Sequence, residues 1–154
     1  MKVKDLMTKE LIKVHPEDTL LRAASLMAEY KISGLPVVDR QTEKLVGIIT
    51  QFDLMKKWLA IHVPSVVSSL AEGQANQSSQ TDIGRYQEGL VADVMTKNVI
   101  TVRADNDIKK ATRLLIENDI NPLPVLNTGE DLVGIISRSD IVGAVDRSML
   151  VDHK

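Results

Sequence analysis

Two short segments carry the side chains whose types and spacing could do chemistry. Thr50-Gln51-Phe52-Asp53 and Ser137-Arg138-Ser139-Asp140 each follow an apolar run, and each places a carboxylate three residues after a hydroxyl. If a helix begins there, its unpaired backbone N–H groups and positive dipole end favour an anion such as phosphate. The hydroxyls can donate to phosphate oxygens, while the carboxylate can accept from both hydroxyls of a ribose. Both segments therefore hold the polar groups that a nucleotide needs.

The same pattern is also typical of a capping box, which needs no ligand. In that interpretation Thr50 or Ser137 caps a helix and the carboxylate three residues on accepts from the backbone at the helix start. The second copy has an extra phosphate donor, Ser139, where the first has Phe52, which can only pack. Arg138 could add positive charge beside a phosphate or lie on a solvated helix face.

Other chemistry has little support in the sequence. Cysteine is absent, and His15, His62 and His153 are scattered, so neither a thiol nucleophile nor a metal centre is expected. A nucleophile paired with a base and a P-loop are also missing from the sequence. We therefore expect a protein that is not an enzyme and has no catalytic residues, no metal and no required cofactor.

The composition is that of a globular protein without a nucleic-acid partner. Lys plus Arg is 19 and Asp plus Glu is 21, a formal net charge of −2, and aromatic residues make up only 3%. This balance provides neither a phosphate-neutralising surface nor a stacking platform. The N-terminus lacks an apolar signal segment, and no apolar run approaches the roughly 18 residues of a membrane span. We expect a cytoplasmic protein with no membrane partner.

The chain contains an internal repeat. The segment VKDLMTKELIKV at residues 3–14 returns as VADVMTKNVITV at residues 91–102, and LVGIITQFDL at 45–54 returns as LVGIISRSDI at 132–141. The two halves are therefore copies of one unit. A unit of this size rarely sustains its own core without disulfides or a metal, so each copy should need the other.

The periodicity inside each unit predicts a mixed α/β (α+β) fold with the order β-α-β-β-α. In the first copy the elements are expected at residues 10–14, 20–30, 35–38, 45–49 and 50–59, with Asp18 and Thr19 as capping candidates for the first long helix. In the second copy they are expected at residues 99–102, 108–118, 123–126, 132–136 and 139–145.

A long connection separates the copies and sets the expected domain boundaries. We assign residues 1–62 to the first repeat, 63–90 to a linker and 91–154 to the second repeat. The linker centre, residues 72–82, is rich in Ser, Gln, Asn and Gly, and we expect it to be mobile. Residues 83–90 are expected to dock against the second copy.

Taken together, the motifs resemble those of the cystathionine-β-synthase (CBS) domain. The pattern D-h-M-T, then h-x-V, an amphipathic helix, I-x-x-L-P-V-V and L-V-G-I-I-[TS]-x-x-D occurs twice, with small departures in the second copy. A tandem pair of this kind resembles a Bateman module. The resemblance implies that the two units pack with pseudo-twofold symmetry and leave two clefts, which in the family often hold AMP, ADP, ATP or S-adenosylmethionine.

The resemblance also implies which residues surround each cleft. Asp53 and Asp140 correspond to ribose ligands, and each faces the early strand and the segment before the Pro of the other repeat. The residues expected around the first cleft are Thr8, Ile12, Ile32, Ser33, Gly34, Pro36, Ser137, Arg138, Ser139 and Asp140. Those expected around the second are Thr50, Phe52, Asp53, Thr96, Ile100, Ile120, Asn121, Pro122 and Pro124.

Within these sets, the isoleucines would sandwich a base or belong to the core. Gly34 would open room for a ligand, whereas Pro122 in the matching place stiffens the chain. The two clefts are therefore not expected to be equivalent.

The expected function is a regulatory sensor that binds an adenine nucleotide between the repeats. Family resemblance further implies a homodimer through the helices that follow the Asp motifs, and a separate regulated protein of unknown identity. Two alternatives remain open, a ligand-free dimerisation or protein-interaction module and a sensor of S-adenosylmethionine or NAD.

Overall fold

The computed structural model describes residues 1–62 and 89–151, and it has two similar halves. The elements of the first are α1 (Val3–Leu6), α2 (Leu20–Tyr30), β1 (Gly34–Val38), β2 (Leu45–Thr50) and α3 (Gln51–His62). Those of the second are α6 (Val91–Val94), β3 (Val102–Arg103), α7 (Ile108–Glu117), β4 (Leu123–Leu126), β5 (Leu132–Ile136) and α8 (Arg138–Val151). The predicted fold of two β-α-β-β-α repeats is confirmed.

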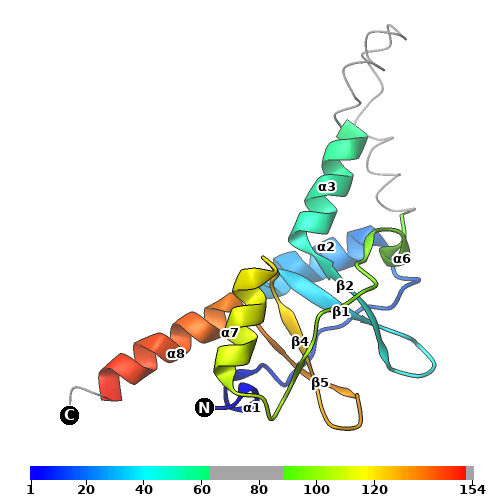
Figure 1. Ribbon diagram of the computed structural model, residues 1–154. Coiled ribbons are helices and arrows are strands. Elements are labelled where there is room, and N and C mark those ends of the chain that lie inside the picture. The colour runs from blue at the N-terminus through cyan, green and yellow to red at the C-terminus, as the bar shows by residue number, and fades with distance from the viewer. Residues whose placement is uncertain (63–88, 152–154) are drawn as a thin grey trace, which may run out of the picture.

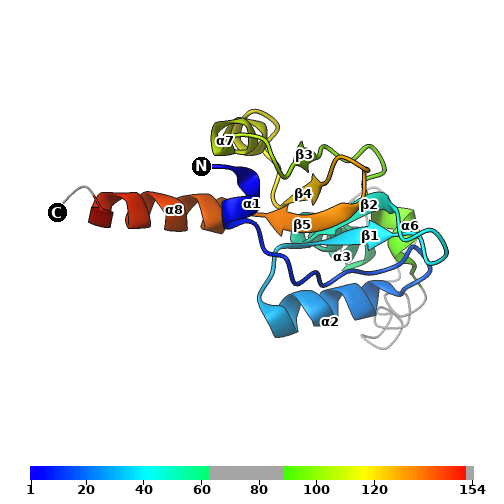
Figure 2. The same ribbon diagram turned by 90° about the horizontal axis from the view of Figure 1, so that it is seen from below.

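Each repeat is built on one antiparallel hairpin. β1 pairs with β2, and β4 pairs with β5, with one register shift near the end of each hairpin. The two hairpins lie in the middle of the molecule, and α2 and α7 cover opposite outer sides (Figure 2). The strands are short apolar runs with Gly and Pro near their starts. Because both faces of these strands are buried, apolar side chains occur at successive positions rather than at every second one.

The first strand of each repeat is shorter than the sequence predicts. In the first repeat the expected strand at 10–14 is reduced to a single parallel bridge between Val14 and Val37. In the second, only Val102 and Arg103 pair in parallel with β4. Thr8 and Thr96, which precede these segments, pair instead with the other repeat, so the intervening residues serve as connections.

Of the two capping candidates for α2, Thr19 is the cap, whereas Asp18 accepts a hydrogen bond from the His15 N–H at 2.8 Å. The Thr19 hydroxyl accepts a hydrogen bond from the Arg22 backbone N–H at 3.1 Å, and Asp107 accepts from the Lys109 N–H at 2.8 Å. The buried face of α2 carries Leu20, Ala23 and Met27. At the other end of the chain, α8 continues to Val151, beyond the predicted end at residue 145.

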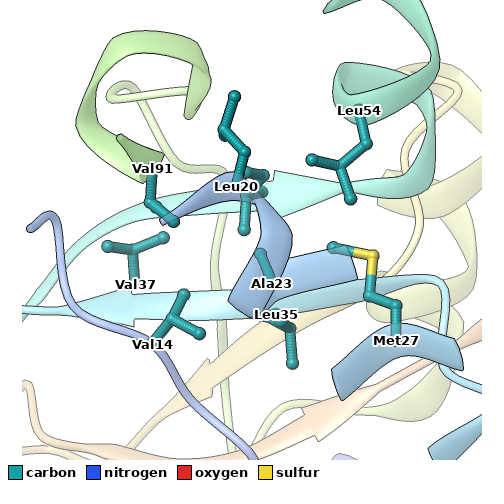
Figure 3. Packing of buried hydrophobic residues seen from close by; sticks show 9 residues of the cluster. Val14, Leu20, Ala23, Met27, Leu35, Val37, Leu54 and Val91 are labelled. Carbon is teal, nitrogen blue, oxygen red and sulfur yellow. The ribbon is translucent and has the colours of Figure 1, made fainter. Parts of the chain in front are cut away.

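The two repeats exchange their short leading helices. Val91 of α6 is fully buried among residues of the first repeat, with Leu20 and Val37 beside it (Figure 3). Val3 of α1 is likewise fully buried, but in the core of the second repeat. Since each core is completed by the other repeat, the expectation that neither copy is self-sufficient agrees with the packing.

Backbone hydrogen bonds fix this exchange. The Val3 N–H donates to the Asn106 carbonyl at 2.9 Å, and the Val91 N–H donates to the Asp18 carbonyl at 2.8 Å. Just after these helices, Thr8 exchanges two backbone hydrogen bonds with Ile135, and Thr96 does so with Ile48. Each hairpin therefore gains a pairing partner from the opposite half.

The described end of the linker contacts the first repeat rather than the second. The Leu20 N–H donates to the Gly89 carbonyl at 2.9 Å, and Leu90 bridges to Thr19. The expectation that residues 83–90 dock on the second copy is therefore wrong for Gly89 and Leu90, because α6, which follows them, belongs to the first core. Residues 63–88, including the centre at 72–82, lie outside the described residues.

Two helices project from the body. α3 and α8 extend beyond the hairpins in different directions, and the Asp motifs lie at their bases (Figure 1). Among the described residues, no helix combines the length and apolar character that crossing a membrane requires.

The helix exchange yields a prediction about cooperativity. Val3→Ala should lower the free energy of unfolding by about 1–3 kcal/mol, because it removes buried methyl groups from the core of the opposite repeat. Urea unfolding followed by circular dichroism and by Trp58 fluorescence should give a single coincident transition for the wild type and for the variant. Lys9→Ala, at an exposed position, serves as the control. Separate transitions, with only one moved by Val3→Ala, would contradict mutual completion of the cores.

Candidate functional site

Two cavities lie between the repeats, and each is lined by residues of both halves. The larger, about 520 Å³, contains Asp53 and is called the Asp53 cavity. The smaller, about 310 Å³, contains Asp140 and is called the Asp140 cavity. Both volumes fall in the range of small-molecule sites.

The structure brings most of the residues expected around the first cleft to the Asp140 cavity. The residues found there are Thr8, Ile12, Ile32, Ser33, Gly34, Ser137, Ser139 and Asp140. Pro36 is buried in β1 instead, where its carbonyl accepts from the Val14 N–H at 3.1 Å. Arg138 lines the other cavity instead. The first cleft is therefore assembled without these two residues.

The Asp53 cavity gathers eight of the nine residues expected around the second cleft. These are Thr50, Phe52, Asp53, Thr96, Ile100, Ile120, Asn121 and Pro122. Pro124 is buried in β4 and does not line the cavity. A ligand contact for any of these residues stays a prediction.

Both Asp motifs form a helix cap. Asp53 Oδ2 accepts hydrogen bonds from the Thr50 N–H at 2.9 Å and from the Thr50 hydroxyl at 3.1 Å. Asp140 Oδ2 accepts equivalent bonds from Ser137, at 2.7 and 3.0 Å. The capping interpretation therefore describes the local geometry of both copies.

The cap leaves the second carboxylate oxygen for other partners. Asp53 Oδ1 lies 3.8 Å from the Lys56 ammonium nitrogen, and Asp140 Oδ1 has no hydrogen-bond partner among residues 1–62 and 89–151. Because an ionised carboxylate offers about four lone-pair sites, capping and ribose binding do not exclude each other. The two interpretations of the motif are compatible in one side chain.

Asp53 is the more sheltered of the two carboxylates. Its side chain is only 10% exposed, and it is the one charged residue classed as buried within the described ranges. Burying a carboxylate is costly unless hydrogen bonds compensate for lost water, and the two Thr50 donors do so. The charge is thus held in place at the start of α3.

Ser33 and Asn121 form a wall shared by the two cavities. The Asn121 side-chain amide donates to the Ser33 hydroxyl at 2.9 Å, while its Oδ1 accepts from the Arg138 backbone N–H at 2.9 Å. Both residues line both cavities. They occupy matching positions in the two repeats, so the wall lies at the pseudo-twofold axis.

Gly34 allows a close contact between the two repeats. A Cβ built at Gly34 would lie 2.6 Å from Pro122 Cδ, so the absent side chain is what lets Pro122 approach. Only a view of both repeats together could reveal this contact. Gly34 also lines the Asp140 cavity, so the expectation that it gives room to a ligand stays a prediction.

Several charged residues at the cavities escaped sequence reasoning. Glu10 and Lys31 line the Asp140 cavity, and Lys56 and Asp119 line the Asp53 cavity. Lys56 could have been found, because it follows Asp53 by one helical turn. Glu10, Lys31 and Asp119 reach the cavities only through tertiary packing and had no local signal. No cluster of three or more His, Cys, Asp or Glu that could hold a metal occurs within the described ranges.

Comparison with known proteins identifies the family. The model of the CBS domain matches residues 3–60 and 91–147. This chain therefore belongs to the CBS domain family and contains a tandem pair of such domains.

Its relatives include proteins of similar and of greater length. An uncharacterized protein of Methanocaldococcus jannaschii, MJ1426, is 32% identical over 94% of this chain and 91% of its own length. Inosine-5'-monophosphate dehydrogenase of the same organism is 33% identical over 92% of this chain, which spans only 23% of that enzyme.

Solved structures of CBS pairs are also similar. The structure of CBSX2 in complex with AMP has a TM-score of 0.72 and 29% identity, with 96% of this chain and 98% of that chain covered. CBSX2 is a protein of Arabidopsis thaliana. The CBS pair of MJ0100, in complex with 5'-methylthioadenosine and S-adenosyl-L-methionine, has a TM-score of 0.71 and 26% identity over 96% of this chain and 98% of that one. CBS pairs thus bind adenosine compounds in these relatives.

The cap geometry predicts a graded response at Asp140. Asp140→Ala should lower the free energy of unfolding by about 0.5–2 kcal/mol, because both Ser137 donors lose their acceptor. Asp140→Asn should cost less, since its amide oxygen can still accept. Urea unfolding without ligand measures both values. Equal stability of the wild type and the Ala variant would show that the cap contributes nothing.

Proposed function

We propose that this chain is a regulatory module that binds an adenine nucleotide, AMP, ADP or ATP, between its two repeats and relays occupancy to a dimer or a partner protein. One observation carries the proposal: each cavity combines a carboxylate whose second oxygen is not used by the helix cap with a hydroxyl at a helix start and with aliphatic side chains from the opposite repeat. The polar groups suit ribose and phosphate, and the apolar side chains suit a base.

The isoleucines support a base site in each cavity. Ile100 and Ile120 are partly buried, pack against the second core and line the Asp53 cavity. Ile12 and Ile32 do the same for the first core and the Asp140 cavity. Each isoleucine side chain therefore packs against the core on one side, and its other side faces the cavity, where a flat adenine ring could lie against it.

The relatives support the adenosine part of the ligand. CBSX2 was solved with AMP, and the MJ0100 pair with 5'-methylthioadenosine and S-adenosyl-L-methionine. These three compounds share adenosine and differ in what is attached to its 5' carbon. All three ligands thus contain adenosine. Among adenosine compounds, the adenine nucleotides are favoured by a helix start that can bind phosphate.

The projecting helices favour a relay through a homodimer. α3 exposes Phe52 and Met55, each 65% exposed, followed by Trp58 and Leu59, and α8 exposes Val142 and Val145. Such a set of apolar side chains is typical of an interaction surface. Because Asp53 and Asp140 lie in the first turns of these same helices, a ligand at the cavities would act directly on the proposed dimer surface. A ligand-free interaction module remains the second candidate, favoured by the same exposed residues.

A thermal-shift panel tests the ligand. AMP, ADP, ATP, S-adenosylmethionine and NAD are each added to the wild type, to Asp140→Asn and to Asp53→Asn. A ligand at 100 times its dissociation constant adds about 2.7 kcal/mol, which should raise the unfolding midpoint by roughly 5–10 °C for a chain of this size. At least one of the Asn variants should lose that shift.

Asp93→Asn is the matched control, since this carboxylate accepts from the Leu90 N–H at 3.3 Å and lies outside both cavities. It should keep the full shift. If none of the five compounds moves the midpoint of the wild type, the ligand-free interaction module becomes the better account.

The dimer has its own test in solution. Sedimentation should give the mass of a dimer for the wild type, and Met55→Glu combined with Leu59→Glu should give the monomer, because burying two carboxylates in an apolar interface is costly. Leu21→Glu, at an exposed position of α2, controls for added charge and should remain dimeric. A monomeric wild type would remove the dimer from the proposal and leave a separate partner as the receiver.

A further inference from the structure

The two cavities differ in the charges around them. Lys56 and Arg138 line the Asp53 cavity, where they balance the carboxylates of Asp53 and Asp119. Both cations belong to flexible side chains, and they come from opposite repeats. An anionic ligand in this cavity would therefore have a cation from each half of the molecule within reach.

The Asp140 cavity has fewer cations than carboxylates. Lys31 is its one lysine or arginine among the described residues, and it faces two carboxylates, Glu10 and Asp140. This cavity offers more hydroxyl donors, since Ser137 and Ser139 both line it. Hydroxyls cannot neutralise charge, whereas guanidinium and ammonium groups make shorter and stronger charge-assisted bonds to phosphate.

The partners of the two cations in the Asp53 cavity differ in exposure. The Arg138 guanidinium donates to Asp119 Oδ1 at 2.8 Å, but Asp119 is 94% exposed and Arg138 is 52% exposed. Lys56 lies 4.9 Å above the Phe52 ring and 3.8 Å from Asp53, with a side chain 61% exposed. The exposed Arg138–Asp119 ion pair contributes about 0–1 kcal/mol, so a phosphate could replace Asp119 as the partner of Arg138 at little cost.

The volumes of the two cavities differ as well, and this difference favours the same assignment as the charges do. The Asp53 cavity has about 520 Å³ and the Asp140 cavity about 310 Å³. The larger volume suits a nucleoside with a chain of phosphates, and the smaller one suits a nucleoside with a compact 5' substituent. Charge and size are independent observations, and both separate the cavities in the same way.

We propose that the Asp53 cavity is the site for an adenosine di- or triphosphate, and that Arg138, reaching over from the second repeat, is the residue that selects the phosphate chain, with Lys56 beside it. The Asp140 cavity disfavours such a chain and suits an adenosine compound with little negative charge. This inference rests on the proposed function and assigns different ligands to its two cavities. The extra hydroxyl of Ser139, a phosphate donor expected from the sequence, thus lies in the cavity that disfavours a phosphate chain.

Isothermal titration with two probes tests the assignment. ATP is the charged probe and 5'-methylthioadenosine the uncharged one. Arg138→Gln should weaken ATP binding at least about tenfold, equivalent to about 1.4 kcal/mol, and change the affinity for 5'-methylthioadenosine by less than about twofold. Arg138→Lys keeps the charge and should recover part of the loss. Arg113→Gln, which removes an exposed arginine paired with Glu117 on α7, should leave both affinities unchanged.

Two further variants assign the cavities. Asp53→Asn should abolish tight ATP binding, and Asp140→Asn should leave it in place. The assignment is overturned if Asp140→Asn alone removes ATP binding, or if Arg138→Gln weakens both probes equally. If the wild type binds 5'-methylthioadenosine but not ATP, the adenosine site survives and the phosphate assignment fails. If it binds neither probe, the proposed function fails together with this inference.

Discussion

The exchange of the short leading helices is the constraint on which the rest of the structure depends. Val3 and Val91 are each fully buried in the core of the opposite repeat, so neither half can close its core alone. The chain that leaves these helices must then run along the opposite hairpin, and it does so at Thr8 and Thr96. Both threonines consequently line cavities whose Asp motif belongs to the other repeat. Each cavity is lined by residues of both repeats because each core is completed by the short leading helix of the other repeat.

Close packing fixes in the same way, in both halves, how the segment after each exchanged helix lies along the opposite hairpin. A Cβ at Gly134 would lie 2.5 Å from Met7 Sδ, and a Cβ at Gly47 would lie 2.6 Å from Met95 Sδ. Each glycine of a hairpin thus admits the methionine that follows the exchanged helix. These matched contacts keep the two repeats in one relative position, and that position decides which side chains meet at the axis.

Sequence differences between the repeats decide which contacts form at the pseudo-twofold axis. Residues at matching positions face each other there, as Ser33 does with Asn121, Gly34 with Pro122, and Lys44 with Asp131. At the last pair the Lys44 ammonium donates to Asp131 at 2.7 Å and lowers the pKa of that carboxyl. Identical residues would bring like charges or like side chains together, whereas the differing residues form complementary contacts.

The local sequence pattern predicted most helices and strands correctly, and there are physical reasons why it could not predict the rest. The helix at 20–30 was predicted from apolar residues at helical spacing and from its capping candidates, and the strand at 123–126 from a short apolar run that repeats the one in the first copy. The short helices α1 and α6 were missed because four residues cannot show a period. The cleft residues came from the family resemblance. Arg138 was expected at the Asp140 cavity because it neighbours Asp140 in sequence, but a helix start turns successive side chains in different directions.

The capping carboxylates connect the candidate sites to the surface of the molecule. Asp53 Oδ2 holds the first turn of α3 through Thr50, while Oδ1 remains beside the cavity. Under the proposed function, a ligand that engages Oδ1 acts on the same residue that fixes the start of the projecting helix. A ligand can shift an equilibrium only by its differential affinity for the two states, and a shared carboxylate provides such a difference whenever the helix start changes its geometry. With Arg138 contributed by α8 to the Asp53 cavity, one bound phosphate chain would contact the bases of both projecting helices at once.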